Sequence, residues 1–169
     1  MTAEGKRVCV TEKPIKNGTM GHSTISHWKD FPWQVVKRQK RDGKVVEARE
    51  KWMHFSPRFL SLYSEWDPGM TIQAHGHNSD HIVFVLEGEM KCGDIVCGPG
   101  THLSLNHGET FGPFEAGPSG CKMYMIMMGD PRSYPADSEG YKKFMADRNI
   151  EPMPNPGVDF PLWLSDGRR

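Results

Sequence analysis

Alternating apolar and polar residues dominate the chain between Arg58 and Gly129. The segments FLSLYSEW, MTIQAHGH, IVFVLEGEM, IVCG, HLSL and KMYMIMM place apolar side chains at a period close to two, which indicates half-buried strands. Turn-forming residues separate them, among them Asp67-Pro68-Gly69 and Gly93-Asp94. Many short strands joined by turns predict an all-β sandwich or barrel.

The segments on either side of this region add to the barrel. Upstream, Asp42-Gly43 separates two further alternating runs and predicts a hairpin. Downstream, Asp137 or Ser138 can cap a short helix that runs through Tyr141, and a tail with four prolines and Trp163 predicts a strap over the barrel or over a neighbouring subunit. We expect one domain over 1–169, with N-terminal strands at 28–54, the barrel core at about 55–130, and the helix and strap at 131–169.

The bulk composition limits the classes of function. The chain has 169 residues with 21 basic and 21 acidic side chains, so no net charge favours a nucleic acid or an anionic membrane surface as partner. No apolar run resembles a signal peptide or a membrane span, which predicts a cytoplasmic protein. The four cysteines lack CxxC spacing and are expected to be reduced, although Cys92 and Cys97 flank a turn and could form a disulfide.

The stretch HGHNSDH places three of the eight histidines within one short segment. On a strand, His75 and His77 point the same way, Gln73 shares their side, and His81 has the same parity beyond an expected bend. Three imidazoles that converge can bind Fe, Ni, Zn, Cu or Mn and leave coordination positions open. The pattern favours a metal site, and the alternative is a polar surface turn.

The spacing around these histidines resembles the first sequence motif of the cupins. That motif is a glycine, five residues, HxH, three or four residues, a glutamate, six residues and a glycine. Here the same spacings join Gly69, His75, His77, His81 and Gly88, and only the glutamate is replaced, by His81. The resemblance covers about Gly69 to Met128 and implies a cupin-type double-stranded β-helix, which is a jelly-roll barrel.

The second cupin motif is present in a degraded form. Counted from Gly100, the glycine spacing holds, but Asn106 stands where the motif has proline and Phe111 where it has a metal-binding histidine. An alternative register begins at Gly93 and makes His102 the shifted ligand. That register needs two deletions, so we prefer the first, in which His102 lies on a strand and faces either the cavity or solvent.

The resemblance therefore implies a three-histidine site that lacks a carboxylate. Three neutral imidazoles leave the charge of a divalent ion uncompensated, which favours an anionic chelating substrate such as an enolate or a diketonate. Cupin-like enzymes with three-histidine Fe(II) sites add O2 across a C–C bond of such compounds. By resemblance we expect a non-haem iron dioxygenase with His75, His77 and His81 on one divalent ion, Fe(II) first and Mn, Ni or Zn as alternatives.

A pocket for a small organic substrate is expected beside the metal. Phe84, Phe111 and Met125 are candidates for its apolar wall, and Gln73 and His102 for polar or acid–base groups. Methionines and phenylalanines at strand alternation are also the usual filling of a barrel interior, so each can equally belong to the core.

Three alternatives to the dioxygenase remain open. The same metal could serve a redox-neutral lyase or isomerase, and the barrel could bind a small molecule without chemistry or could have lost its metal. Surplus strands and the apolar tail predict a homodimer in which exposed sheet edges are paired.

Overall fold

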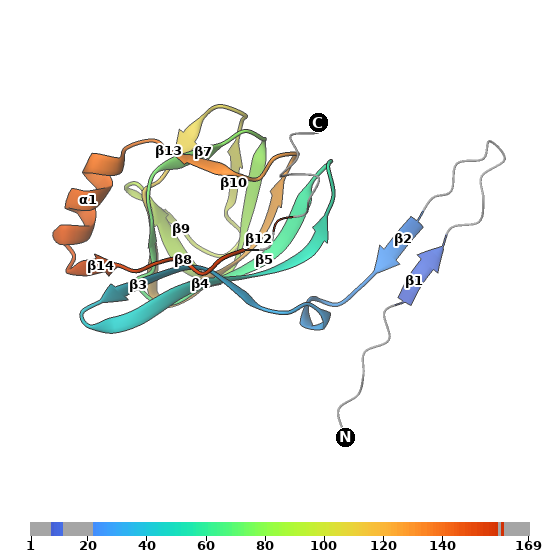
Figure 1. Ribbon diagram of the computed structural model, residues 1–169, viewed down its shortest axis with the longest axis horizontal. Coiled ribbons are helices and arrows are strands. Elements are labelled where there is room, and N and C mark those ends of the chain that lie inside the picture. Colours follow the sequence, from blue (N-terminus) through green and yellow to red (C-terminus); the bar gives the residue numbers. More distant parts are fainter. Residues whose placement is uncertain (1–7, 12–21, 159, 161–169) are drawn as a thin grey trace, which may run out of the picture. The chain divides into compact units, whose positions relative to one another are not determined.

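Two units make up the computed structural model, which describes residues 8–11, 22–158 and 160 (Figure 1). The residues before Trp33 contain an antiparallel pair, β1 (Val8–Thr11) and β2 (His22–Ile25), and a 3-10 turn, η1 (Trp28–Asp30). The second unit begins at Trp33 and contains every residue of the predicted site. The prediction of one domain over 1–169 stays a prediction.

The second unit is built from strands and one α-helix, so the all-β prediction is confirmed. Its elements are β3 (Gln34–Arg41), β4 (Lys44–Phe55), β5 (Leu60–Trp66), β6 (Thr71–Ile72), β7 (His75–His77), β8 (His81–Cys92), β9 (Ile95–Cys97), β10 (His102–Leu105), β11 (Thr110–Phe111), β12 (Phe114–Met127), β13 (Ser133–Pro135), α1 (Ser138–Ala146) and β14 (Ile150–Pro152).

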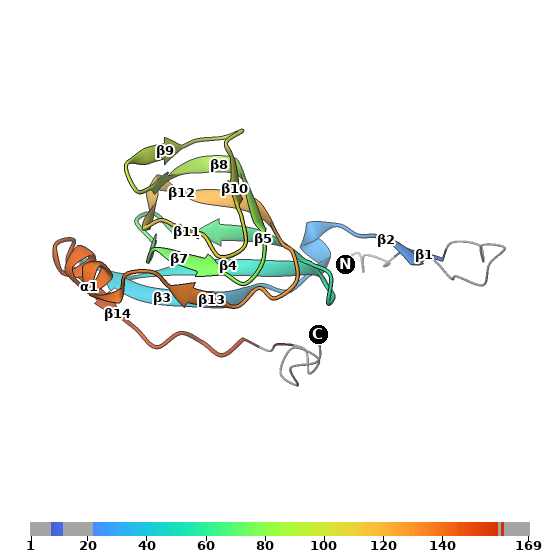
Figure 2. The same ribbon diagram turned by 90° about the horizontal axis from the view of Figure 1, so that it is seen from above.

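Two antiparallel sheets form a jelly-roll barrel. The larger has the order β10-β8-β12-β5-β4-β3-β14, with β6 paired to β12 and β9 to β8, and the smaller has the order β11-β7-β13. Figure 2 shows β3 and β4 along one side of the barrel, where the predicted hairpin turns at Asp42 and Gly43. The N-terminal strands therefore extend the large sheet, as predicted.

Side-chain alternation on the long strands fills the barrel interior. Leu60, Leu62, Val85 and Met123 are fully or almost fully buried, and each large apolar side chain buried in this way contributes about 1.5–3 kcal/mol. Met125 belongs to the same buried set and also borders the cavity described below. The methionines of β12 therefore contribute both to the core and to the cavity wall, the two roles considered for them.

The C-terminal segments are anchored to this barrel. Asp137 is the N-cap of α1 and accepts a hydrogen bond from the Gly140 N–H, so the helix prediction is confirmed. The buried Tyr141 hydroxyl lies 2.9 Å from Thr71 Oγ1 and ties the helix to β6. Asn155 Oδ1 accepts a hydrogen bond from the Arg38 N–H, so the described part of the tail lies against β3 of its own barrel. Trp163 lies outside the described residues.

Two further expectations concern thiols and membranes. The side chains of Cys92 and Cys97 are free thiols, so the disulfide considered between them is absent. Among residues 8–11, 22–158 and 160, no helix combines the length and the hydropathy that crossing a membrane requires.

Candidate metal centre

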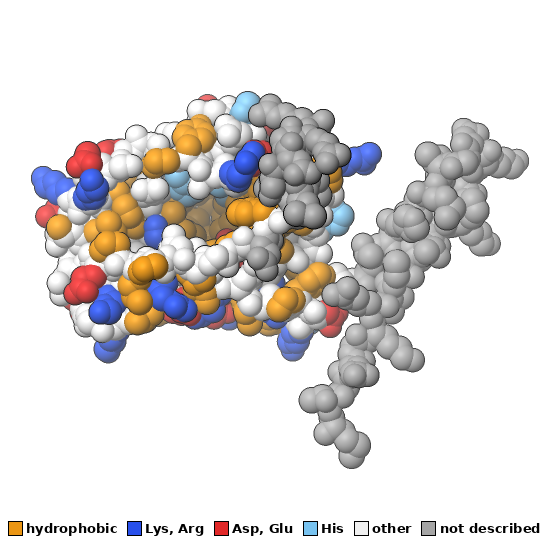
Figure 3. Space-filling model, in the orientation of Figure 1, with side chains coloured by type: hydrophobic (Ala, Val, Ile, Leu, Met, Phe, Trp, Pro, Cys, Tyr) orange, Lys and Arg blue, Asp and Glu red, His pale blue; other side chains and the backbone are white. Residues whose placement is uncertain are grey.

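The three histidines of the HGHNSDH stretch line one cavity of about 260 Å³ inside the barrel. His75 and His77 come from β7 in the smaller sheet, and His81 begins β8 in the larger sheet. A hollow in the barrel is visible in Figure 3, with histidine and hydrophobic side chains in its wall. The apolar part of the cavity wall consists of Val36, Trp66, Ile72, Val83, Met90, Phe111, Phe114, Met125 and Met127.

Gly76 explains how β7 fits between its neighbours. A Cβ at this position would lie 2.3 Å from the carbonyl oxygen of Glu109 and 2.6 Å from the hydroxyl of Tyr134. Since β11 and β13 pair with β7 on its two sides, only glycine allows this close approach. The backbone that carries His75 and His77 is therefore held on both sides.

The imidazole rings form a continuous row with Phe111 beside it. The ring centroids of His75 and His77 lie 5.0 Å apart, and those of His77 and His81 lie 4.8 Å apart. The Phe111 ring lies 5.1 Å from His75 and 5.4 Å from His81. Phe111, which stands where the second motif has a histidine, therefore lies beside the three histidines.

Backbone carbonyls orient two of the three rings. Nδ1 of His75 lies 2.8 Å from the Gln73 carbonyl oxygen, and Nδ1 of His77 lies 2.8 Å from the Pro131 carbonyl oxygen. A carbonyl only accepts, so each Nδ1 carries the proton and the Nε2 lone pair of the neutral ring is left free. This is the arrangement that commonly fixes the tautomer of a metal-ligating histidine.

The cavity keeps all three imidazoles neutral at neutral pH. Burial lowers the pKa of His75 to about 4, against the opposing effect of its hydrogen bond to the Gln73 carbonyl. Burial also lowers the pKa of His77, and burial together with the neighbouring His77 and His75 lowers the pKa of His81 well below its usual value. Neutral imidazoles are the form that binds metal ions.

Unpartnered nitrogens are the observation that best fits a bound ion. Nε2 of His77 and both ring nitrogens of His81 are buried, and no partner for them occurs in the described part of the chain. Leaving such groups unsatisfied costs about 1–3 kcal/mol each. Across the same residues, no three His, Cys, Asp or Glu side chains already stand in a metal-holding arrangement. The donor set fits a metal by its chemistry, but the coordination shell is not preformed.

The other candidates from the sequence divide into two groups. Gln73, Phe111 and Met125 line the cavity with the histidines. Phe84 and His102 are exposed, directly opposite each other on β8 and β10, and neither lines the cavity. The place expected for Phe84 in the apolar wall is wrong because Phe84 has the opposite strand parity to the buried Val83 and Val85. His102, for which the cavity and solvent were both open, faces solvent.

The cavity also contains two charged side chains that the motifs did not indicate. Glu50 on β4 and Lys37 on β3 line it from the larger sheet. Glu50 has the parity of the buried Val46 and Ala48, so an acid at an inward position was a usable signal. Lys37 lies just after a register shift at Val35, so strict alternation does not predict which way its side chain points.

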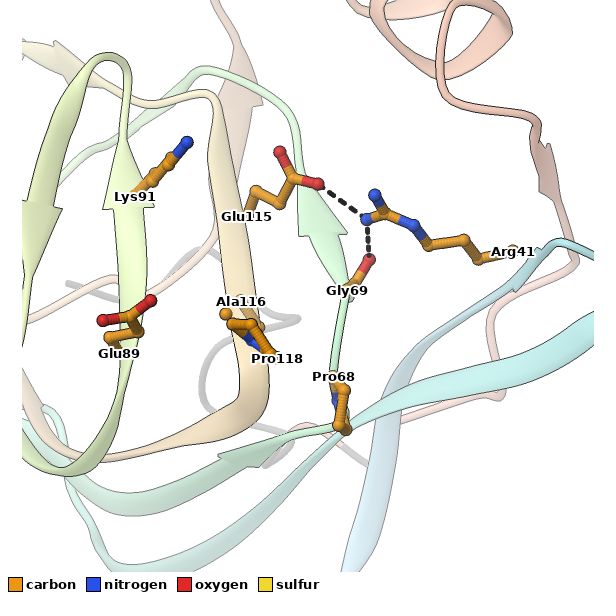
Figure 4. A pocket seen from close by; sticks show the side chains of 9 residues that line it. Arg41, Pro68, Gly69, Glu89, Lys91, Glu115, Ala116 and Pro118 are labelled. Atoms are coloured by element: carbon orange, nitrogen blue, oxygen red, sulfur yellow. Dashed lines mark hydrogen bonds and ion pairs between the residues drawn. The ribbon is translucent and has the colours of Figure 1, made fainter.

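A second, larger hollow of about 510 Å³ has a different character (Figure 4). Arg41 and Glu115 in its wall are paired, because Arg41 Nη1 donates to Glu115 Oε1 at 2.7 Å and to the Gly69 carbonyl at 2.8 Å. Arg148 also donates to Glu115, so this cluster joins β3, β12 and the turn that follows α1. No histidine is among the described residues that line this hollow, and the pairing of Glu115 with two arginines is that of a structural ion cluster.

Comparisons with known proteins identify the fold. No protein-family model and no curated protein matches the chain. The solved structure of the polyketide cyclase RemF from Streptomyces resistomycificus covers 72% of this chain and 92% of its own, with 21% identity and a TM-score of 0.57. A candidate acetylacetone dioxygenase from Methylibium petroleiphilum covers 79% and 88%, with 14% identity and a TM-score of 0.55. At these identities the likeness shows the fold alone.

Proposed function

We propose, from the premise that this chain has the cupin fold, that it is a metal-dependent enzyme acting on a small oxygenated organic compound. The predicted resemblance to cupins is confirmed at the level of the fold. One observation carries the proposal: three neutral histidines line one cavity, and two of them have buried ring nitrogens that find no partner among the described residues. His75, His77 and His81 would hold the ion, with Fe(II) favoured over Mn, Ni or Zn.

The chemistry of the cavity suits a small chelating substrate. When bound, a divalent ion on three neutral imidazoles supplies uncompensated positive charge that attracts two oxygens of a diketonate or hydroxyketone. Phe111, Phe114 and Met125 provide an apolar surface for the carbon skeleton and limit access of water. We propose a dioxygenase that cleaves a C–C bond of such a compound, and the likeness to a candidate acetylacetone dioxygenase supports this choice.

A redox-neutral lyase or isomerase is the second candidate. It is favoured by Glu50, whose carboxyl group lines the cavity and can move protons without any oxidant. The likeness to a polyketide cyclase also supports it. The two candidates differ in their need for O2, which makes them separable with one substrate series.

The test begins with the ion. The full chain, loaded anaerobically with Fe(II) or Mn(II) and desalted, is expected to retain one metal ion per chain by elemental analysis. His81→Ala should lose most of it, whereas His102→Ala, a change at an exposed histidine outside the cavity, should retain it. Wild-type protein that retains no stoichiometric metal would overturn the proposal.

Oxygen consumption then separates the two candidates. With pentane-2,4-dione or a hydroxyketone as probe, the Fe(II) protein is expected to consume O2, and the apo protein is not. Conversion of the probe at the same rate under argon would replace the dioxygenase with the redox-neutral enzyme.

We also propose that the protein is a homodimer that associates through an apolar part of its surface. Large apolar side chains remain exposed on neighbouring strands of the barrel, namely Phe84, Leu86, Ile95 and Val96. Light scattering at the 19.2 kDa mass of one chain would reject the dimer.

A further inference from the structure

We infer that Glu50 is the proton-transfer group of the histidine cavity and acts on substrates with an acidic hydrogen next to a carbonyl group. This inference rests on the proposed function, because it requires the cavity to be an active site. It goes beyond the histidine motif, since Glu50 comes from β4, a strand outside that motif, and restores to the cavity a carboxyl group that the motif has lost.

The position of Glu50 is fixed by a tryptophan. Trp52 Nε1–H donates a hydrogen bond of 2.7 Å to Glu50 Oε2 from the next inward position of β4. The Trp52 ring is itself packed, with its centroid 5.1 Å from that of Phe55 and 5.6 Å from that of Phe160 in the C-terminal tail. A carboxyl group held in this way has one orientation relative to the cavity.

The second carboxyl oxygen is available for chemistry. Within the part of the chain that the structure describes, Oε1 of Glu50 accepts no hydrogen bond and forms no ion pair. The other titratable groups that line the cavity are Lys37 on β3, His75 and His77 on β7, and His81 on β8. One anchored oxygen and one free oxygen are what a general base needs to meet a substrate proton.

The electrostatics of the cavity agree with this geometry. Burial raises the pKa of Glu50 to about 7, against the opposing effect of the Trp52 hydrogen bond. Burial lowers the pKa of Lys37 to about 8, so a cation shares the cavity with the carboxyl group. A base that titrates near neutrality can both accept and return a proton, and the Lys37 ammonium can attract the anionic oxygen that forms.

The step that follows is a simple proton transfer. Oε1 of the Glu50 carboxylate forms an O–H bond with a hydrogen on the carbon next to the carbonyl group. The C–H bond breaks, and its electron pair moves into the substrate to give an enolate whose charge lies on oxygen. Return of the proton, or of a deuteron from D2O, to the same carbon restores the carbonyl group and the carboxylate, so the step needs neither oxidant nor reductant.

The test uses hydrogen exchange, which does not depend on O2. The metal-loaded full chain is incubated anaerobically in D2O with 3-hydroxybutan-2-one, and deuterium incorporation next to the carbonyl is followed by NMR. Glu50→Gln should lower the exchange rate at least about 100-fold while retaining its metal. Glu47→Gln is the matched control, because Glu47 lies on the outward side of the same strand, paired with Arg38, and should exchange like the wild type.

A pH profile distinguishes a proton-transfer role from a structural one. The wild-type exchange rate should rise with pH through an inflection near 7, and Glu50→Gln should lack that inflection. Trp52→Phe keeps an aromatic ring but removes the N–H donor to the carboxylate, so its inflection should move to higher pH.

The possible outcomes separate this inference from the proposed function. Equal exchange by Glu50→Gln and wild type, or no exchange by a wild-type protein that binds one metal ion per chain, overturns the role of Glu50 and leaves the metal enzyme standing. Loss of metal from Glu50→Gln makes Glu50 a ligand instead and also overturns the inference. A wild-type protein that binds no metal overturns the proposed function, and with it the inference that rests on it.

Discussion

The rings of His77 and His81 lie 4.8 Å apart and nearly perpendicular, at 85°, and three of their four ring nitrogens have no partner among the described residues. The fourth, Nδ1 of His77, lies against the Pro131 carbonyl. Buried polar groups are normally satisfied, and this pair contributes three of the five buried side-chain atoms that lack a partner among the described residues. Because these unpartnered nitrogens destabilise the ligand-free fold, a ligand that binds them should stabilise the protein.

The first prediction concerns the cost of His81 in the absence of metal. His81→Leu removes two buried nitrogens that have no partner in the described part of the chain. It is expected to raise the metal-free free energy of unfolding by about 1–2 kcal/mol. The same variant should lose the rise in Tm that Fe(II) or Mn(II) gives the wild type. Thermal melts with and without metal check both, with His102→Leu as the exposed control. A metal-free His81→Leu protein less stable than wild type would contradict the prediction.

The second prediction tests the close approach at Gly76. Gly76→Ala places a methyl group 2.3 Å from the backbone carbonyl oxygen of Glu109, so β7 must move. We expect a loss of at least about 2 kcal/mol in unfolding free energy and weaker metal binding. Gly98→Ala is the matched control, since a Cβ there meets nothing within 4 Å. Similar urea midpoints for the two variants would show that β7 is not constrained as described.

The third prediction restores the histidine that the second motif lacks. Phe111→His places an imidazole beside His75 and His81, where the Phe111 ring now lies. A fourth donor should tighten Zn(II) or Mn(II) binding about tenfold, equivalent to about 1.4 kcal/mol. Phe84→His adds a histidine on the exposed face and should leave affinity unchanged. Equal affinities for both variants in competition with a chelator would contradict the prediction.

The fourth prediction is a dependence of stability on pH through Glu50. Its pKa rises from 4.5 to about 7 on folding, so the folded protein binds more protons than the unfolded chain between these values. Glu50 therefore stabilises the fold less as pH rises through that window. Glu50→Gln lacks this effect, so its stability relative to wild type should increase by about 2 kcal/mol from pH 4.5 to above 7, after allowance for partial exposure. A constant difference in urea titrations across that range would argue against it.

Local patterns in the sequence were sufficient for the barrel and for the histidine stretch. Alternation on β5, β8 and β12 predicts which side chains are buried, and the Asp42-Gly43 turn and the Asp137 cap follow from backbone preferences that act over a few residues. The motif spacing also predicted that His75, His77 and His81 share one site, and they do line one cavity. The three-ligand assignment itself stays a prediction.

Contacts between distant strands decided the rest. The parity of Phe84 already indicated an outward position, whereas the exposure of His102 depends on the register of β10 against β8. Glu50 shares the cavity with the histidines only because β4 of the larger sheet and β7 of the smaller one both border it, and Lys37 does so after a register shift in β3. The sequence by itself determined the alternation, the turns and the spacing of the histidines, because these depend on local geometry. The tertiary structure alone decided which charged groups share the cavity, because burial and proximity depend on how the sheets close.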